Sequence, residues 1–244
     1  MPLPAEFLAA QQLLRQQQAA QAWTALAPLL DREPVPATVL LLAGRIQLAL
    51  DQTAAARGYF TRAVASAPRS HAAHFLLGFC LYVDNDFTPA LAALTAAQKL
   101  NPADGATLLY LALTHEGLAQ NDDALRLYPR AVALNPSAEA ALAYARLLFT
   151  LHRFNEAEAQ IKEALRRDPQ YREAYYERAR LHLEAGHFAE AATDAERALT
   201  LPGRSQTQRQ IHFLLARAYQ KLGDVPRAAR HREAFESIPP RLVR

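Results

Sequence analysis

The sequence is poor in the residues that build disulfides, strands and tight turns. Cys80 is the only cysteine among 244 residues, so no internal disulfide can form and no thiolate metal site is indicated. Only eight glycines occur, and alternating runs of Val, Ile and Thr bounded by turn residues are missing. Much of the apolar content is alanine and leucine, which favour helices. We therefore expect an all-α protein in which Cys80 packs as a small buried hydrophobe.

Long apolar runs are also absent. No window holds about 18 uninterrupted apolar residues, so we expect no helix that spans a membrane. Residues 1–6 lack the basic region and apolar run of a secretory signal, which favours a cytoplasmic protein.

Motifs of catalysis are missing as well. The sequence has no glycine loop that cradles phosphate, no GxSxG nucleophile elbow and no HExxH zinc motif. His71 and His74 have a spacing that can hold a metal on one helical face, but no carboxylate accompanies them. We interpret them as packed side chains, and we expect a protein that is not an enzyme and has no cofactor or metal site.

The charge is unevenly distributed along the chain. Residues 1–136 hold nine Lys or Arg and ten Asp or Glu, whereas the last 41 residues hold nine and three. A solvated surface is one interpretation of this basic end, and contact with nucleic-acid phosphates is the other. The arginines that would make such contacts are Arg227, Arg230, Arg232, Arg241 and Arg244.

A repeat of about 34 residues runs through the chain. Prolines recur every 33 or 34 residues, at Pro34, Pro68, Pro102, Pro136, Pro169 and Pro202. Alanines recur in a fixed phase to them, at Ala22, Ala56, Ala90, Ala124, Ala157, Ala191 and Ala228. Twelve residues before each alanine lies another small residue, at Ala10, Gly44, Gly78, Ala112, Ala145, Ala179 and Ala216. A third set of small residues lies seven positions after the alanines of the first set, at Ala63, Ala97, Ala131, Ala164 and Ala198. In the end units the same position holds Leu29 and Phe235. Small residues let two antiparallel helices approach closely, and each proline ends a second helix.

Small residues at positions 8, 20 and 27, followed by proline at position 32, resemble the tetratricopeptide repeat. The sixth unit matches best, through Tyr175–Ala179, Gly186–Ala191 and Arg197–Leu199. The resemblance implies a right-handed α-solenoid, in which antiparallel helix pairs stack into one superhelical domain over residues 1–244. Its repeats would lie at about residues 3–36, 37–70, 71–104, 105–137, 138–171, 172–208 and 209–240. The first and last are degenerate, and we expect residues 202–208 to form a longer loop before the last repeat.

In this family, the first helix of each pair lines a concave groove that holds a partner. The resemblance and helical spacing place positions 5, 9 and 12 of these helices on the groove. The candidate partner-binding residues of repeats two to four are Leu41, Phe75, Phe79, Tyr82, Leu109 and Leu113. Those of repeats five to seven are Arg146, Tyr176, Arg180, Phe213 and Arg217. The sequence therefore predicts an apolar zone, of the kind that marks an interaction site, and an arginine-rich zone.

The three arginines of the second zone differ in their own helices. Arg180 has Glu177 and Glu184 within one helical turn, so we expect its charge to be neutralised locally. Arg146 and Arg217 have no acid at those offsets. They are the predicted anchors for a carboxylate, because guanidinium binds such groups through two parallel hydrogen bonds.

Together these features predict a protein–protein interaction scaffold, an adaptor or a chaperone that binds an apolar and acidic segment of a partner. The lysine and asparagine clamp of the family members that bind acidic chaperone tails is absent, since its places hold Leu41, Arg45, Leu76, Ala106 and Tyr110. One alternative is an accessory or substrate-recruiting module of an enzyme or of a secretion or assembly machine. Nucleic-acid binding at the basic end is less favoured. A homodimer through the C-terminal repeat, at Phe235, is a further option.

Overall fold

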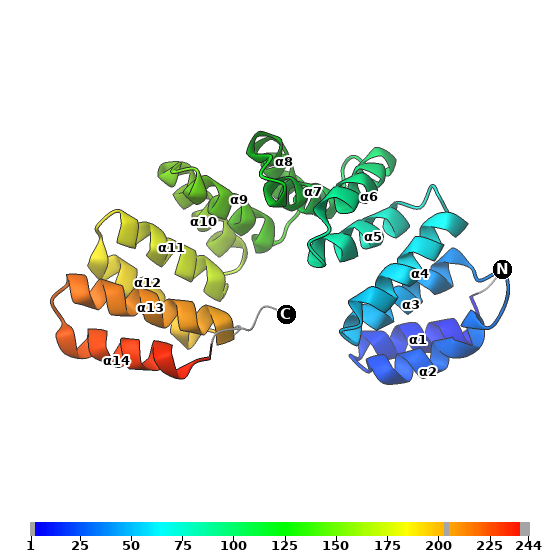
Figure 1. The fold of residues 1–244 in the computed structure, drawn as a ribbon, viewed down its shortest axis with the longest axis horizontal. Helices are drawn as coiled ribbons and strands as arrows, with labels where there is room; N and C mark the ends of the chain where they lie inside the picture. The colour runs from blue at the N-terminus through cyan, green and yellow to red at the C-terminus, as the bar shows by residue number, and fades with distance from the viewer. Residues whose placement is uncertain (1–2, 203–204, 240–244) are drawn as a thin grey trace. The chain divides into compact units, whose positions relative to one another are not determined.

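The computed structural model describes residues 3–202 and 205–239, with only the backbone of residues 205 and 206. Over these residues the chain forms fourteen α-helices and no strand, which confirms the predicted all-α repeat fold. Each odd-numbered helix packs against the even-numbered helix that follows it, so the helices form hairpins (Figure 1). No helix in this part of the chain is long and apolar enough to cross a membrane. The chain divides into two compact units, Met1–Asn135 and Pro136–Arg244, and a single solenoid domain stays a prediction.

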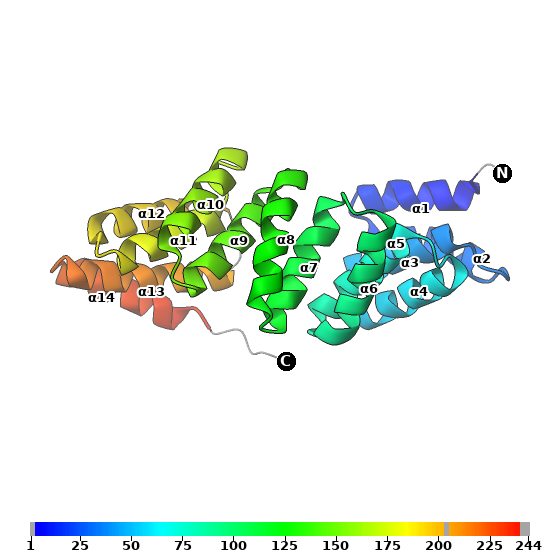
Figure 2. The same ribbon diagram turned by 90° about the horizontal axis from the view of Figure 1, so that it is seen from above.

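The first unit contains four hairpins. They are α1 (Ala5–Arg15) with α2 (Ala19–Leu30), α3 (Ala37–Ala49) with α4 (Thr53–Ser66), α5 (His71–Val83) with α6 (Phe87–Leu100), and α7 (Gly105–Gly117) with α8 (Asn121–Leu134). The second helix of one hairpin packs against the first helix of the next, as Figure 2 shows for α6 and α7. Each of α3, α5 and α7 is thus held by its own partner and by the preceding hairpin.

The second unit contains three hairpins of the same kind. They are α9 (Ala138–Thr150) with α10 (Phe154–Arg167), α11 (Arg172–Glu184) with α12 (Phe188–Thr200), and α13 (Ser205–Lys221) with α14 (Val225–Ser237). The predicted loop over residues 202–208 is wrong in part, because α13 already begins at Ser205 and is 17 residues long. Residues 205–208 contain no proline or glycine, so nothing prevents them from adding a first turn to the helix. Gly203 and Arg204, also in the predicted loop, lie outside the described residues.

The small-residue ladders mark the places where helices touch, as predicted. The alanines of the second helices from Ala22 to Ala191 are each 0% exposed. A Cβ on Gly44 would lie 2.4 Å from the ring of Phe60, so only glycine leaves room for that ring. Cys80 is also 0% exposed. The pKa of its thiol is raised to about 12, mainly because the side chain is buried. Its predicted place in the core is confirmed.

Every hairpin turns through one residue in the left-handed region of φ. These residues are Gln17, Asp51, Asn85, Ala119, His152, Gly186 and Gly223. The amide of the following residue donates back to the first helix, as Asp86 N does to Leu81 O at 2.8 Å. Because five of the seven are not glycine, each of those turns costs roughly 1 kcal/mol that helix packing must offset. No residue type marks the position, which is why the sequence did not predict it.

Two histidines face each other between α13 and α14. The Nδ1 atoms of His212 and His231 are 3.0 Å apart, so one imidazole must be neutral and accept from the other. Burial is the main cause that lowers the pKa of both side chains. The charge of Glu196 opposes this shift at His231, whereas those of Arg230 and Arg227 reinforce it. The last hairpin therefore favours neutral imidazoles.

Candidate functional site

Four aromatic rings gather on the first helices α5 and α7 of the first unit. Tyr110 lies at their centre, with its ring centroid 5.0 Å from Phe79, 5.5 Å from Tyr82 and 6.0 Å from Phe75. Spacings of four and three residues place the three α5 rings on one helical face. Each contact is edge to face, which contributes about 0.5–1.5 kcal/mol beyond the burial of the rings. We call these four half-buried rings the aromatic platform.

The three leucines predicted for the same surface differ in how much of each side chain is exposed. Leu41 on α3 and Leu113 on α7 are half-buried and retain some surface. Leu109 is only 1% exposed, so its side chain belongs to the core between the helices and offers nothing to a partner. It lies next to Tyr110, so the surface of α7 in this region comes from the tyrosine and not from the leucine.

His71 and His74 have separate hydrogen-bonding partners. His71 Nε2 is 3.0 Å from Thr107 Oγ1, on α7, and His74 Nε2 is 2.9 Å from the carbonyl oxygen of Pro68. Both imidazoles thus contact neighbouring protein groups, in agreement with their interpretation as structural side chains. The expectation that no carboxylate accompanies them is wrong for His71, because Asp104 Oδ2 lies 3.6 Å from its Nε2.

In the second unit, one buried carboxylate joins two of the three predicted arginines. Glu177 on α11 is 4% exposed and accepts from Arg146 Nε, on α9, at 2.7 Å. Its other oxygen accepts from Arg180 Nη1 at 2.5 Å. The prediction that Arg180 pairs with Glu177 is confirmed. Arg146 has no acid within one turn of its own helix, as the sequence shows, but Glu177 of the next first helix pairs with it, so Arg146 is not the unpaired anchor that was predicted.

Aromatic rings lie around Arg180, the second arginine of this network. The guanidinium carbon of Arg180 lies 4.4 Å from the centroid of Phe149 and 5.9 Å from that of Tyr176. Burial, as the main cause, raises the pKa of the Tyr176 hydroxyl, so this ring is neutral in the physiological range. These groups border a pocket of about 180 Å³ whose lining also includes Leu183, Glu184, Phe213, Leu214 and Arg217.

Arg217 differs from the other two arginines. It is exposed, lies 6.0 Å from the ring centroid of Phe213, and forms no ion pair within the described residues. Phe213 is itself 49% exposed, which is unusual for so large an apolar side chain. Arg217 and Phe213 thus place an exposed guanidinium beside an exposed aromatic ring.

Some residues of these surfaces were not among the predicted site residues. Tyr110 falls one position after the expected groove position, and Glu177 acts from a different helix than Arg146. Phe149 occupies the predicted groove position 12, so helical spacing could have identified it. Tyr110 and the Arg146–Glu177 pair could not be identified in this way, because their contacts depend on how hairpins stack.

The basic C-terminal end is only partly available. Arg227 pairs with Asp224 at 2.5 Å, and it also donates to the hydroxyl of Tyr219. Arg230 and Arg232 are exposed and form no ion pair with another described residue. Arg241 and Arg244 lie outside the described residues.

Stacked helical hairpins that present side chains from their first helices define the class of helical-repeat proteins. A family model described as "Tetratricopeptide repeat" matches residues 7–68, 41–105 and 145–206, which together exceed half of the chain. The chain therefore belongs to the tetratricopeptide repeat family. A search of curated proteins gives no match.

Solved structures share this fold at low sequence identity. A chain of the APC/C hetero-tetramer Cut9-Hcn1 superposes with a TM-score of 0.81 and 18% identity over 99% of this chain and 47% of that one. The present chain thus spans about half the length of that neighbour. A tetratricopeptide repeat protein from Parabacteroides merdae gives 0.73 and 19%, covering 96% and 92% of the two chains. PilF from Pseudomonas aeruginosa gives 0.70 and 19%, covering 79% and 88%.

Proposed function

We propose that this protein is an interaction scaffold that captures a partner through an apolar and acidic segment. The observation that carries this proposal is Arg217 beside Phe213, because both offer surface that no other described residue occupies. An arginine that is not paired within its own protein can form two parallel hydrogen bonds with a carboxylate. The neighbouring ring excludes water from that contact and accepts apolar surface of the same partner.

The aromatic platform of the first unit is a second surface that suits apolar side chains of a partner. Its four rings are held by one another, so little side-chain entropy is lost when a partner covers them. Half-buried aromatic residues are also those that most often dominate binding energy at protein interfaces. The role of an adaptor or chaperone in a larger assembly is the form of this function that we favour, since the neighbours include a chain of the APC/C hetero-tetramer.

The test is selection of short segments from a random displayed peptide library with the intact protein. We expect selected peptides to be rich in apolar residues and to carry an acidic residue or a free carboxylate. Arg217→Glu should weaken binding of a selected peptide about 10- to 100-fold, since hydrogen bonds to a charged group contribute about 1.5–3 kcal/mol. Arg230→Glu, which reverses an exposed charge on α14, is the matched control and should retain the affinity.

A second pair of variants tests the aromatic platform. Phe79→Ala should weaken selected peptides that bind the aromatic platform, because it removes the ring closest to Tyr110. Tyr59→Ala removes a half-buried ring from α4, where it contacts Trp23, and should not change binding. Selected peptides without acidic groups, or equal affinity for Arg217→Glu and Arg230→Glu, would contradict the role of Arg217. Nucleic acid that competes with the peptides and binds with a steep salt dependence would favour the other interpretation of the basic end.

A further inference from the structure

A groove lies between the two helices of the C-terminal hairpin. It has a volume of about 280 Å³ and is lined by Phe213, Ala216, Arg217, Gln220, Arg232, Phe235 and Glu236. In the preceding hairpin the same surface is covered, because α13 packs against both α12 and α11. No described helix covers the groove between α13 and α14, so its apolar centre faces outward.

The residues of this groove differ from those that receive the next helix elsewhere in the unit. At the equivalent positions of α12, Ala195 and Ala198 are 0% exposed beneath α13. In α14 these positions hold Arg232 and Phe235, and the following one holds Glu236. Bulky and charged side chains prevent a helix from approaching as closely as α13 approaches α12. The groove is therefore not shaped to receive another repeat of the same kind.

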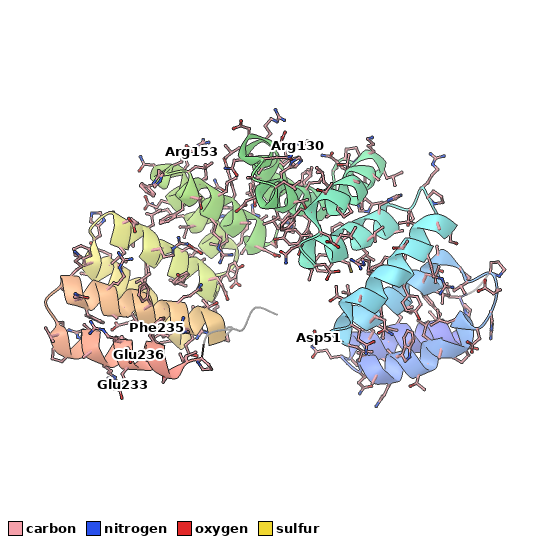
Figure 3. All side chains as sticks on the ribbon, in the orientation of Figure 1. Asp51, Arg130, Arg153, Glu233, Phe235 and Glu236 are labelled. Carbon is pink, nitrogen blue, oxygen red and sulfur yellow. The ribbon has the colours of Figure 1, made fainter. Side chains whose placement is uncertain are left out.

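Its chemistry is that of an interface between separate chains. The rings of Phe213 and Phe235 lie 5.4 Å apart and form an apolar centre. Figure 3 shows Phe235 between α13 and α14, with Glu236 beside it and Glu233 on the side of α14 that faces away from α13. Exposed charged residues surround this centre, as a polar rim surrounds the core of many protein interfaces.

Two rim charges of opposite sign are available. Arg232 and Glu236 are one helical turn apart, yet neither forms an ion pair with another described residue. An acid four residues after a base is the less favourable order on a helix, which is consistent with their remaining separate. Arg217 also lines the groove, near its apolar centre, whereas Arg232 and Glu236 on α14 together suit a surface that carries the same two residues.

We infer that a second copy of this chain occupies the groove, with the two α14 helices antiparallel about a twofold axis. Such an axis places a surface against itself, so that residue i meets j and residue j meets i. Near the axis, Phe235 and Phe213 of one copy meet the same rings of the other. On either side, Arg232 of one copy lies opposite Glu236 of the second copy. This association would cover Phe213, so a dimer and a partner segment captured at Arg217 and Phe213 exclude one another, and the dimer is therefore tested with no partner present.

The test is sedimentation velocity of the full chain over a concentration series from about 1 to 500 µM, the range in which weak interfaces associate. We expect a dimer at the upper end. Arg232→Glu and Glu236→Arg each place like charges opposite one another twice, so each variant alone should raise the dissociation constant at least tenfold. Both side chains are exposed, so these changes should leave helicity by circular dichroism unchanged.

Restoration of the pairs distinguishes this arrangement from others. An equal mixture of the two single variants pairs two acids with two bases and should dimerise as well as the wild type. The double variant Arg232→Glu with Glu236→Arg should also dimerise, because it exchanges the two charges. Glu233→Arg has the same charge change on the other side of α14 and should remain dimeric (Figure 3).

A wild-type chain that stays monomeric throughout the series would overturn the inference. The groove would then be left for a different protein or an acidic helical peptide. A dimer that persists in both single variants, or a mixture that fails to restore it, would also overturn it.

Discussion

Substitution of Glu177 by Gln should destabilise the second unit and make its arginines available to an acidic ligand. Glu177 accepts from Arg146 at 2.7 Å and from Arg180 at 2.5 Å. Glutamine has nearly the same shape, but its single oxygen can serve only one of the two guanidinium groups. Its amide nitrogen is a donor and would face the other donor, so one hydrogen bond is lost and the remaining one has a neutral acceptor in place of a charged one.

The size of this effect follows from the exposure of the three side chains. A hydrogen bond to a charged group contributes about 1.5–3 kcal/mol to stability. The carboxylate of Glu177 is 6% exposed, but the guanidinium-bearing side chains of Arg146 and Arg180 are 45% and 35% exposed, so water recovers part of the loss. We therefore expect the free energy of unfolding to fall by roughly 2 kcal/mol.

Urea denaturation followed by circular dichroism measures this change. Glu184→Gln, on the same helix α11, also removes one negative charge near Arg180, but its side chain is exposed and should alter stability by no more than about 0.5 kcal/mol. Binding of an acidic peptide to Glu177→Gln should be tighter than to wild type. Equal unfolding midpoints for the Glu177 and Glu184 variants would refute the conclusion that one carboxylate holds two arginines.

Three more results are expected. Gly44→Ala should lower the free energy of unfolding by about 1–2 kcal/mol, because overpacking against Phe60 costs more than the gain in helix propensity. Gly58→Ala should raise it by up to about 1 kcal/mol, because a Cβ there meets nothing within 4 Å. Thermal or chemical unfolding measures both changes. Cys80 should react with a thiol reagent only at the rate of unfolding, and rapid stoichiometric labelling of the native protein would contradict its burial. Because the pKa values of His212 and His231 are lowered on folding, their contribution to stability should be complete above about pH 6.5 and fall as the pH drops below it, and His212→Gln should flatten this dependence in unfolding midpoints measured against pH.

The parts of the fold that depend on local spacing could be predicted from the sequence. The ladders of small residues appear because every hairpin needs close helix contact at the same two or three points. Ala56 and Gly44 illustrate this, since larger residues would overlap the helix opposite. Burial of Cys80 followed from its place among apolar neighbours.

Features that depend on stacking between hairpins could not be predicted in this way. The exposure of Leu109 was misjudged because helical spacing gives the direction of a side chain but not the neighbour that covers it. Helical spacing reveals an acid only within one turn of Arg146 on its own helix, whereas Glu177 is 31 residues away in sequence. The predicted loop extends too far into α13 because residues 205–208 are polar, and polar residues are common in loops as well as at the start of a helix.

One position explains why Arg217, among the three equivalent arginines of the second unit, is left for a partner. Arg146, Arg180 and Arg217 occupy the same position in successive repeats, and Glu177 lies three residues before Arg180. The residue three before Arg217 is Leu214, which is 3% exposed and packs in the core formed by α11 to α14. A carboxylate in that place would be buried at a cost that only a well-formed ion pair could offset. Leu214 thus stands where the preceding repeat has its acid, and the guanidinium of Arg217 remains exposed without that partner.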